Sequence, residues 1–156
     1  MKKLNIKLLV ICIFVPLLVG ALSAFLSMGG MKEFETVNQP PLTPPGIVFP
    51  IVWTILYIVM GIASYLVLSG KPGIYASRGL IYYALQLVFN FFWSIFFFRF
   101  SLYTFSFLWL LVLLGLIIVT IYNFYKVEKW AGYLLIPYAI WVSFAGYLTL
   151  GTAILN

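Results

Sequence analysis

Five long apolar segments, separated by short polar connections, make up almost the whole chain. Each segment has about 20 residues, the length that an α-helix needs to cross the roughly 30 Å hydrocarbon core of a bilayer. Proline, glycine and charged residues interrupt the apolar runs. The pattern predicts an all-α membrane protein, a bundle of five transmembrane helices in a single domain over 1–156. The expected spans are 8–27, 47–68, 78–98, 104–125 and 131–154.

The longest connection, residues 28–46, carries a cluster of prolines. Proline lacks a backbone donor, fixes φ and restricts the residue before it, so this cluster cannot lie inside a helix. We expect the whole connection to be a stiff loop that covers the mouth of the bundle as a lid. The lid prolines are Pro40, Pro41, Pro44 and Pro45.

Composition supports the membrane assignment. The chain of 156 residues is 65% hydrophobic and only 8% charged, whereas soluble domains are about a quarter charged. The net charge of +6 does not indicate nucleic-acid binding, because the basic residues stand at the ends of the spans. There they set the topology and meet anionic lipid headgroups.

The basic residues are unequally divided between the two sides of the predicted bundle. Seven of the nine fall on the side of the N-terminus: Lys2, Lys3, Lys7, Lys71, Arg78, Lys126 and Lys129. The other side has Lys32 and Arg99. Because cytoplasmic loops carry the excess of Lys and Arg, we expect a cytoplasmic N-terminus and an outward-facing lid.

Polar, small and aromatic residues recur at helical spacing inside four of the spans, so each set shares one helix face. The four stripes are Pro16, Gly20, Ser23 and Ser27; Trp53, Tyr57, Met60 or Gly61, and Ser64; Gln86, Asn90, Trp93 and Phe97; and Pro137, Trp141, Ala145 and Leu148, with Phe144 adjoining. Such residues commonly hold membrane helices together, and packing alone is one interpretation of these stripes.

Three tryptophans on three different stripes favour a binding site instead. Trp53, Trp93 and Trp141 should converge inside the bundle, where indole rings stack on flat apolar ligands and indole and amide donors orient them. Trp109 and Trp130 lie near predicted helix ends and suit the role of interface anchors. The stripes therefore predict an aromatic intramembrane cavity.

The chemistry available in the spans is narrow. The chain has no histidine and one cysteine, Cys12, and its three acidic residues all fall in predicted loops. We therefore expect no metal site, no nucleophile–histidine pair and no intramembrane ion relay. One-electron or photo-oxidation through Trp and Tyr remains, without a metal or a covalently bound cofactor.

Residues from the lid and from three of the spans carry a resemblance to one known family. They are Pro40-Pro41, Pro44-Pro45, Phe49-Pro50, Trp53-Thr54, Leu56-Tyr57, Met60-Gly61, Gln86, Asn90, Trp93-Ser94, Phe96-Phe97, Pro137-Tyr138, Trp141, Phe144-Ala145 and Leu148. With them the chain resembles the TspO/translocator-protein family, also called the tryptophan-rich sensory or peripheral benzodiazepine receptor family. The resemblance covers nearly the whole chain.

The resemblance implies a five-helix bundle, commonly a homodimer, in a bacterial cell membrane. It implies porphyrins such as protoporphyrin IX, other tetrapyrroles and hydrophobic drugs of the benzodiazepine type as ligands, and roles in tetrapyrrole handling and stress response. The ligand-binding residues carried over are Phe49, Trp53, Tyr57, Asn90, Trp93, Trp141, Phe144, Ala145 and Leu148, and the first stripe adds Ser23. Trp53 and Trp141 are the candidates for oxidative catalysis.

Two departures from the family pattern bear on the ligand. The family often has Leu-Asn near the end of the fifth helix, whereas Thr149 follows Leu148 here, so one polar contact differs. Its sterol motif needs a base closely after a tyrosine, but no Lys or Arg follows Tyr147. Cholesterol is therefore a doubtful partner, and the looser match at Val119, Tyr122 and Lys126 is only a hypothesis.

Three functions stay open in a fixed order of preference. The first is a membrane receptor or sensor that binds porphyrins and hydrophobic drugs in the aromatic cavity. The second is an enzyme that degrades protoporphyrin with light and oxygen, using the pocket tryptophans. The third is a tetrapyrrole transporter, which has no support from an inverted repeat or a pair of broken helices.

Overall fold

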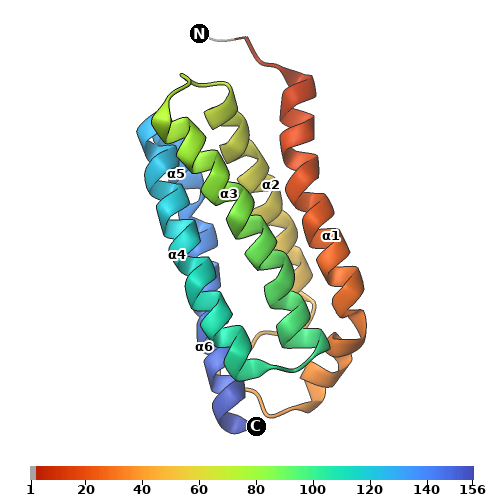
Figure 1. Cartoon of the computed structure of the whole chain (residues 1–156). Helices are drawn as coiled ribbons and strands as arrows, with labels where there is room; N and C mark the ends of the chain where they lie inside the picture. Colours follow the sequence, from red (N-terminus) through yellow and green to blue (C-terminus); the bar gives the residue numbers. More distant parts are fainter. Residues whose placement is uncertain (1–2) are drawn as a thin grey trace.

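The computed structural model describes residues 3–156. Five helical segments in this part of the chain are long and apolar enough to cross a membrane. They form an elongated bundle in which the start of α1 and the end of α6 lie at opposite ends (Figure 1). The described residues contain no strand, which confirms the all-α fold class. The elements are α1 (Ile6–Thr36), α2 (Val48–Leu68), α3 (Ile74–Ser94), the π-helix η1 (Ile95–Arg99), α4 (Tyr103–Val127), α5 (Lys129–Leu134) and α6 (Ile136–Leu155).

The first helix is longer than predicted, and the lid is correspondingly shorter. We expected the span to end at Ser27 and a loop to occupy 28–46, but α1 continues to Thr36. Gly30 lies inside α1, where a side chain would collide with the Phe98 carbonyl of η1, so the close packing of α1 on η1 requires glycine there. Phe34, only 4% exposed, holds the last turns against the bundle. The extended lid is therefore limited to residues 37–47.

The third span also differs from the prediction at both ends. Helix α3 begins at Ile74 rather than 78, and its last turn is a π-helix that ends at Arg99. A π-turn holds more residues than an α-turn. Phe97 and Phe98, which are adjacent in sequence, are consequently both buried.

The fifth span is two helices rather than one. Helix α5 ends at Leu134, and α6 begins at Ile136 with a proline in its first turn, where proline needs no intrahelical donor. The predicted stripe put Pro137 inside the bundle, but Pro137 is exposed and Tyr138 is buried in its place. Ala145 and Leu148, later members of the same stripe, are buried as predicted.

Close contacts between pairs of helices hold the bundle together. Helix α1 packs on α2, and α3 packs on α4, which in turn carries α6. A Cβ at Gly61 of α2 would lie 2.7 Å from the Cys12 carbonyl oxygen of α1. This is the small-residue contact that lets membrane helices approach closely.

Two remaining expectations concern residues near the span ends. Trp109 is not a free anchor: its Nε1 donates a 2.8 Å hydrogen bond to the Phe89 carbonyl, and the two rings stack at 4.2 Å. Trp130, on α5, is 65% exposed.

Glu33 and Glu35 belong to α1 and not to a loop. Lys2, which contributes to the charge bias, lies outside the described residues.

Candidate functional site

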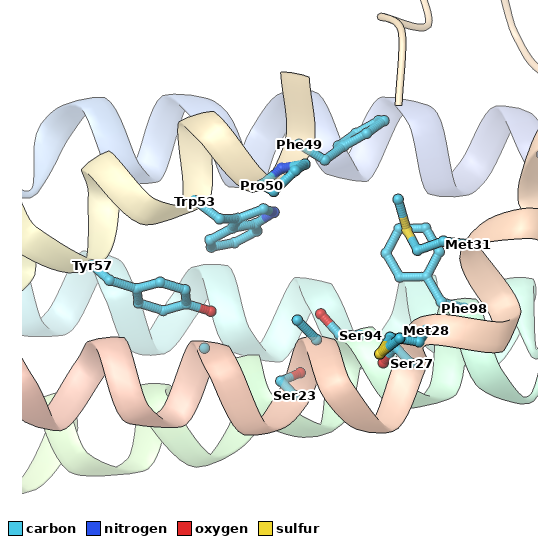
Figure 2. Close-up of a pocket in the computed structure, with 12 residues that line it drawn as sticks. Ser23, Ser27, Met28, Met31, Phe49, Pro50, Trp53, Tyr57, Ser94 and Phe98 are labelled. Atoms are coloured by element: carbon cyan, nitrogen blue, oxygen red, sulfur yellow. The ribbon is translucent and has the colours of Figure 1, made fainter. Parts of the chain in front are cut away.

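A cavity of about 290 Å³ lies between α1 and the first turns of α2 and is closed at one end by Phe98 (Figure 2). We call it the main cavity. Most of its wall is apolar, and exposed residues such as Ala24, Met28 and Pro50 form its rim. The lining residues are Gly20, Ser23, Ala24, Ser27, Met28, Met31, Phe49, Pro50, Trp53, Tyr57, Ser94 and Phe98.

Aromatic rings of α2 face hydroxyl groups of α1 across this cavity (Figure 2). Trp53 and Tyr57, one helical turn apart, stack with ring centroids at 5.6 Å. Opposite them, Ser23 donates a 3.0 Å hydrogen bond to the Phe91 carbonyl. Ser27 Oγ is buried and has no hydrogen-bond partner among residues 3–156. The cavity thus offers two aromatic rings and, at Ser27, a buried hydroxyl that is free to bond.

The three predicted tryptophans do converge, but the space between them is nearly filled. Trp53 and Trp141 meet edge to face with centroids at 6.5 Å, and Trp93 stacks on Phe97 at 5.3 Å. The pocket that they share, here the three-tryptophan pocket, holds only about 10 Å³. Its lining residues are Phe34, Phe49, Trp53, Trp93, Phe97, Phe98, Trp141, Ala145, Leu148 and Thr149.

Phe49 separates three spaces. It lines the main cavity, the three-tryptophan pocket and a third space of about 330 Å³ beneath the lid, here the lid cavity. Its ring lies edge to face with Trp141 at 6.0 Å and with Phe34 at 6.2 Å. No other described residue lines all three. The lid cavity is lined by Met31, Phe34, Glu35, Gln39, Thr43, Pro44, Pro45, Gly46 and Phe49.

The lid is fastened to the end of α6. The backbone N–H of Asn38 donates to Asn156 Oδ1 at 3.2 Å, and Asn156 Nδ2 donates to the Asn38 carbonyl at 2.7 Å. Pro40 lies against Gly151, where a Cβ would be only 2.6 Å from the proline ring. Of the expected lid prolines, Pro44 and Pro45 line the lid cavity, while Pro40 and Pro41 contact α6.

A buried chain of hydrogen bonds forms the floor beneath Tyr57. Its hydroxyl donates to Asn90 Oδ1 at 3.1 Å, and Asn90 Nδ2 donates to the Tyr138 hydroxyl at 2.8 Å. Tyr138 then donates to Gln86 Oε1 at 2.5 Å. The chain joins α2, α3 and α6 and pairs four polar side chains of these helices in the bundle interior.

The structure brings most of the predicted ligand-binding residues to two adjoining spaces. Ser23, Phe49, Trp53 and Tyr57 line the main cavity, and Phe49, Trp53, Trp93, Trp141, Ala145 and Leu148 line the three-tryptophan pocket. Asn90 and Phe144 line neither. Asn90 is completely buried between two tyrosines. Phe144 contacts Trp141 from outside the pocket, with centroids at 5.6 Å.

Sequence reasoning missed much of the wall nearest the lid. Met28, Met31 and Phe34 were assigned to a loop, so their helical spacing was not considered. Phe98 lies one position beyond Phe97 and enters the wall through the π-turn. The glycine pair before Met31 indicated a loop, so the helical spacing of Met28, Met31 and Phe34 was not recognised. Phe98 could not be predicted because a regular α-helical period does not turn two adjacent residues to the same side.

Comparisons with known proteins agree over nearly the full length. A family profile described as the TspO/MBR family matches residues 12–155. The chain is 37% identical over 154 residues to the tryptophan-rich protein TspO of Chlorobaculum tepidum, covering 97% of this chain and 98% of that protein. It is also 37% identical over 128 residues to a translocator protein homolog of Schizosaccharomyces pombe (80% and 78% covered), and 31% identical over 137 residues to the translocator protein of Bos taurus (85% and 80% covered).

Proposed function

Because this chain belongs to the TspO/MBR family and is an integral, multi-pass membrane protein, we propose that it is a receptor or sensor for porphyrins, with protoporphyrin IX as the reference ligand. Other flat hydrophobic molecules, including benzodiazepine-type drugs, would bind in the same place. The observation that carries the proposal is the main cavity of about 290 Å³, with Trp53 and Tyr57 on one wall.

The chemistry of the wall suits a large flat ligand. Stacked aromatic faces attract a planar π-system, while the mostly apolar lining favours transfer from the bilayer. Protoporphyrin is larger than the main cavity, and Phe49 borders both this cavity and the two neighbouring spaces. In this proposal the bound macrocycle displaces the Phe49 ring and reaches Trp141.

Titration of the purified full-length protein with protoporphyrin IX in the dark tests this function. We expect saturable quenching of tryptophan fluorescence together with a shift in porphyrin absorbance. Trp53→Phe combined with Trp141→Phe should weaken binding, whereas Trp130→Phe, at an exposed residue on α5, should not. Binding that is unchanged in the double variant, or no saturable binding at all, would refute the proposal.

A second function is favoured by the contact between two oxidisable rings. Trp53 and Trp141 touch edge to face in the same cluster, so a bound porphyrin excited by light would lie near both. In this alternative the protein degrades protoporphyrin with light and oxygen. Illumination in air after the dark titration should then give a product that is absent from protein-free detergent and from the double variant. Product that merely matches the protein-free sample contradicts catalysis and leaves the binding proposal standing.

A further inference from the structure

An apolar groove of about 220 Å³ lies between α1 and α3 on the outer face of the bundle. We call it the α1–α3 groove. It shares no lining residue with the main cavity, which lies between α1 and α2. Because exposed residues of a membrane span face hydrocarbon, the groove opens toward lipid chains. Its lining residues are Val19, Leu22, Leu87, Val88, Phe91 and Phe92.

A polar bond beside the groove fixes the spacing of its two helices. Ser23, next to Leu22 on α1, donates a 3.0 Å hydrogen bond to the carbonyl of Phe91 on α3. The two helices are therefore joined at this depth, while the apolar side chains around the bond leave the groove unfilled. Water would find no polar side chain among the lining residues. The groove consequently needs an apolar occupant from the membrane.

A cation stands at the lid-side end of the groove. Arg99 is the last residue of η1, and its amide nitrogen would lie 2.8 Å from a Cβ at Gly30, so its backbone is held against α1. Its guanidinium donates to the Leu26 carbonyl of α1 at 3.3 Å, one helical turn beyond Leu22. It also lies 5.8 Å from the centroid of the Phe100 ring. Neither contact is acidic, so neither neutralises the charge of Arg99.

We propose that the α1–α3 groove and Arg99 form a binding site for one anionic phospholipid. An acyl chain lies in the groove, and the phosphate binds the guanidinium, which forms charged hydrogen bonds with phosphate oxygens. The helical turn between Leu22 and Leu26, about 5.4 Å long, accommodates the glycerol and ester groups. The order of these parts is that of a lipid in a bilayer, with the charge at the span end and the chain toward the middle. The site goes beyond the proposed porphyrin site and does not depend on it.

Two lipids with identical palmitoyl and oleoyl chains test the headgroup. Native mass spectrometry follows the delipidated full-length protein during titration with phosphatidylglycerol or phosphatidylcholine. We expect the first phosphatidylglycerol to bind about fivefold more tightly, because one basic residue near the surface attracts an anionic lipid by about 1 kcal/mol. Arg99→Gln should reduce this preference to about twofold or less. Lys32→Gln, at an exposed base on the same side of the bundle, is the matched control and should keep the preference.

Filling the groove tests the place of the acyl chain. Val88 lines the groove and is 50% exposed, whereas Val112 on α4 is 51% exposed and lies outside it. We expect Val88→Trp to weaken the binding of both lipids about fivefold, equivalent to about 1 kcal/mol, and to keep their ratio. Val112→Trp should change neither affinity. Equal effects of the two substitutions would contradict the groove as the site.

A measurement on the wild-type protein does not depend on how the variants fold. Phosphatidylglycerol with a diazirine in its acyl chain should label residues 19–22 of α1 and 87–92 of α3 more strongly than exposed Ile118 of α4. Even labelling of all exposed faces, equal affinity for the two lipids, or a full preference in Arg99→Gln would overturn the inference. A dimer that Val88→Trp separates with no change in lipid affinity would also overturn it, because a second copy would then cover the groove.

Discussion

The Tyr147 hydroxyl donates a 2.7 Å hydrogen bond to the carbonyl oxygen of Pro41, across 106 positions of sequence. Proline has no N–H of its own, so the lid can hold few backbone bonds, and its position depends on acceptors such as this one. Together with the bonds between Asn38 and Asn156, the contact ties the lid to α6. The lid is thus an attached part of the bundle at the mouth of the site.

Loosening that attachment should make the lid more mobile. We expect Tyr147→Phe, which removes only the hydroxyl, to speed hydrogen exchange of the lid amides about fivefold, the effect of one hydrogen bond of about 1 kcal/mol. Exchange in α3 and α4 should not change. Tyr133→Phe, at an exposed ring on α5, is the control. Equal exchange rates in the two variants would contradict a role for Tyr147 in holding the lid.

The contact between α1 and α2 should tolerate nothing larger than glycine. In Gly61→Ala the new methyl group would meet the α1 backbone at Cys12 and Ile13, which cannot move as a flexible side chain can. We expect a loss of stability of about 1–3 kcal/mol, typical of overpacking. Gly115→Ala is the matched control, since no atom lies within 4 Å of a Cβ built there. It should be neutral or stabilising by up to about 1 kcal/mol. Thermal unfolding in detergent measures both, and equal effects would refute the close contact.

The buried polar floor should behave as one cooperative unit. Asn90→Leu leaves the hydroxyls of Tyr57 and Tyr138 without a partner at one side, and we expect a loss of about 1–3 kcal/mol. Adding Tyr57→Phe should cost less than it does in the wild type, because its partner is already gone. A double-mutant cycle on thermal stability should give a coupling of about 0.5–3 kcal/mol. Strictly additive effects would mean that the two side chains do not interact.

Filling the main cavity from its rim should block ligands without harming the fold. Ala24 is exposed and lines the cavity, whereas Ala21, one helical turn earlier on α1, is exposed and does not. We expect Ala24→Phe to weaken protoporphyrin binding by about tenfold or more, equivalent to about 1.4 kcal/mol. Ala21→Phe should bind normally. If both variants bind alike, the ligand does not occupy the space between α1 and α2.

The sequence predicted the bundle and much of the site because both depend on helical spacing. Ser23, Trp53, Trp93 and Trp141 each belong to a set of residues at helical spacing. Such a set lies on one face of a membrane helix, and its small, polar and aromatic members turn that face toward the bundle interior. The end of α1 could not be predicted this way. Gly29 and Gly30 are typical of a loop, yet Gly30 lies inside α1 at its contact with η1.

Two further features depend on partners that local patterns do not contain. The π-turn brings both Phe97 and Phe98 inside, which contradicts the regular period on which the stripe was drawn. The family resemblance implies Asn90 as a ligand contact, and its spacing predicts only that it faces inward; the structure pairs it with Tyr57 and Tyr138 from two other helices. Spacing shows which way a residue faces and not which atoms it meets there.

The position of the main cavity determines which ligand concentration controls occupancy. Its rim is formed by exposed side chains of α1 and α2, including Ala24 and Met28, and exposed residues of a membrane span face hydrocarbon. A ligand that enters there is drawn from the lipid phase. Occupancy then follows the mole fraction of ligand dissolved in the bilayer, so a dissociation constant expressed in aqueous units contains the lipid–water partition coefficient. Doubling the lipid at fixed total ligand should nearly halve the occupancy of a weakly occupied site, although no contact in the protein has changed.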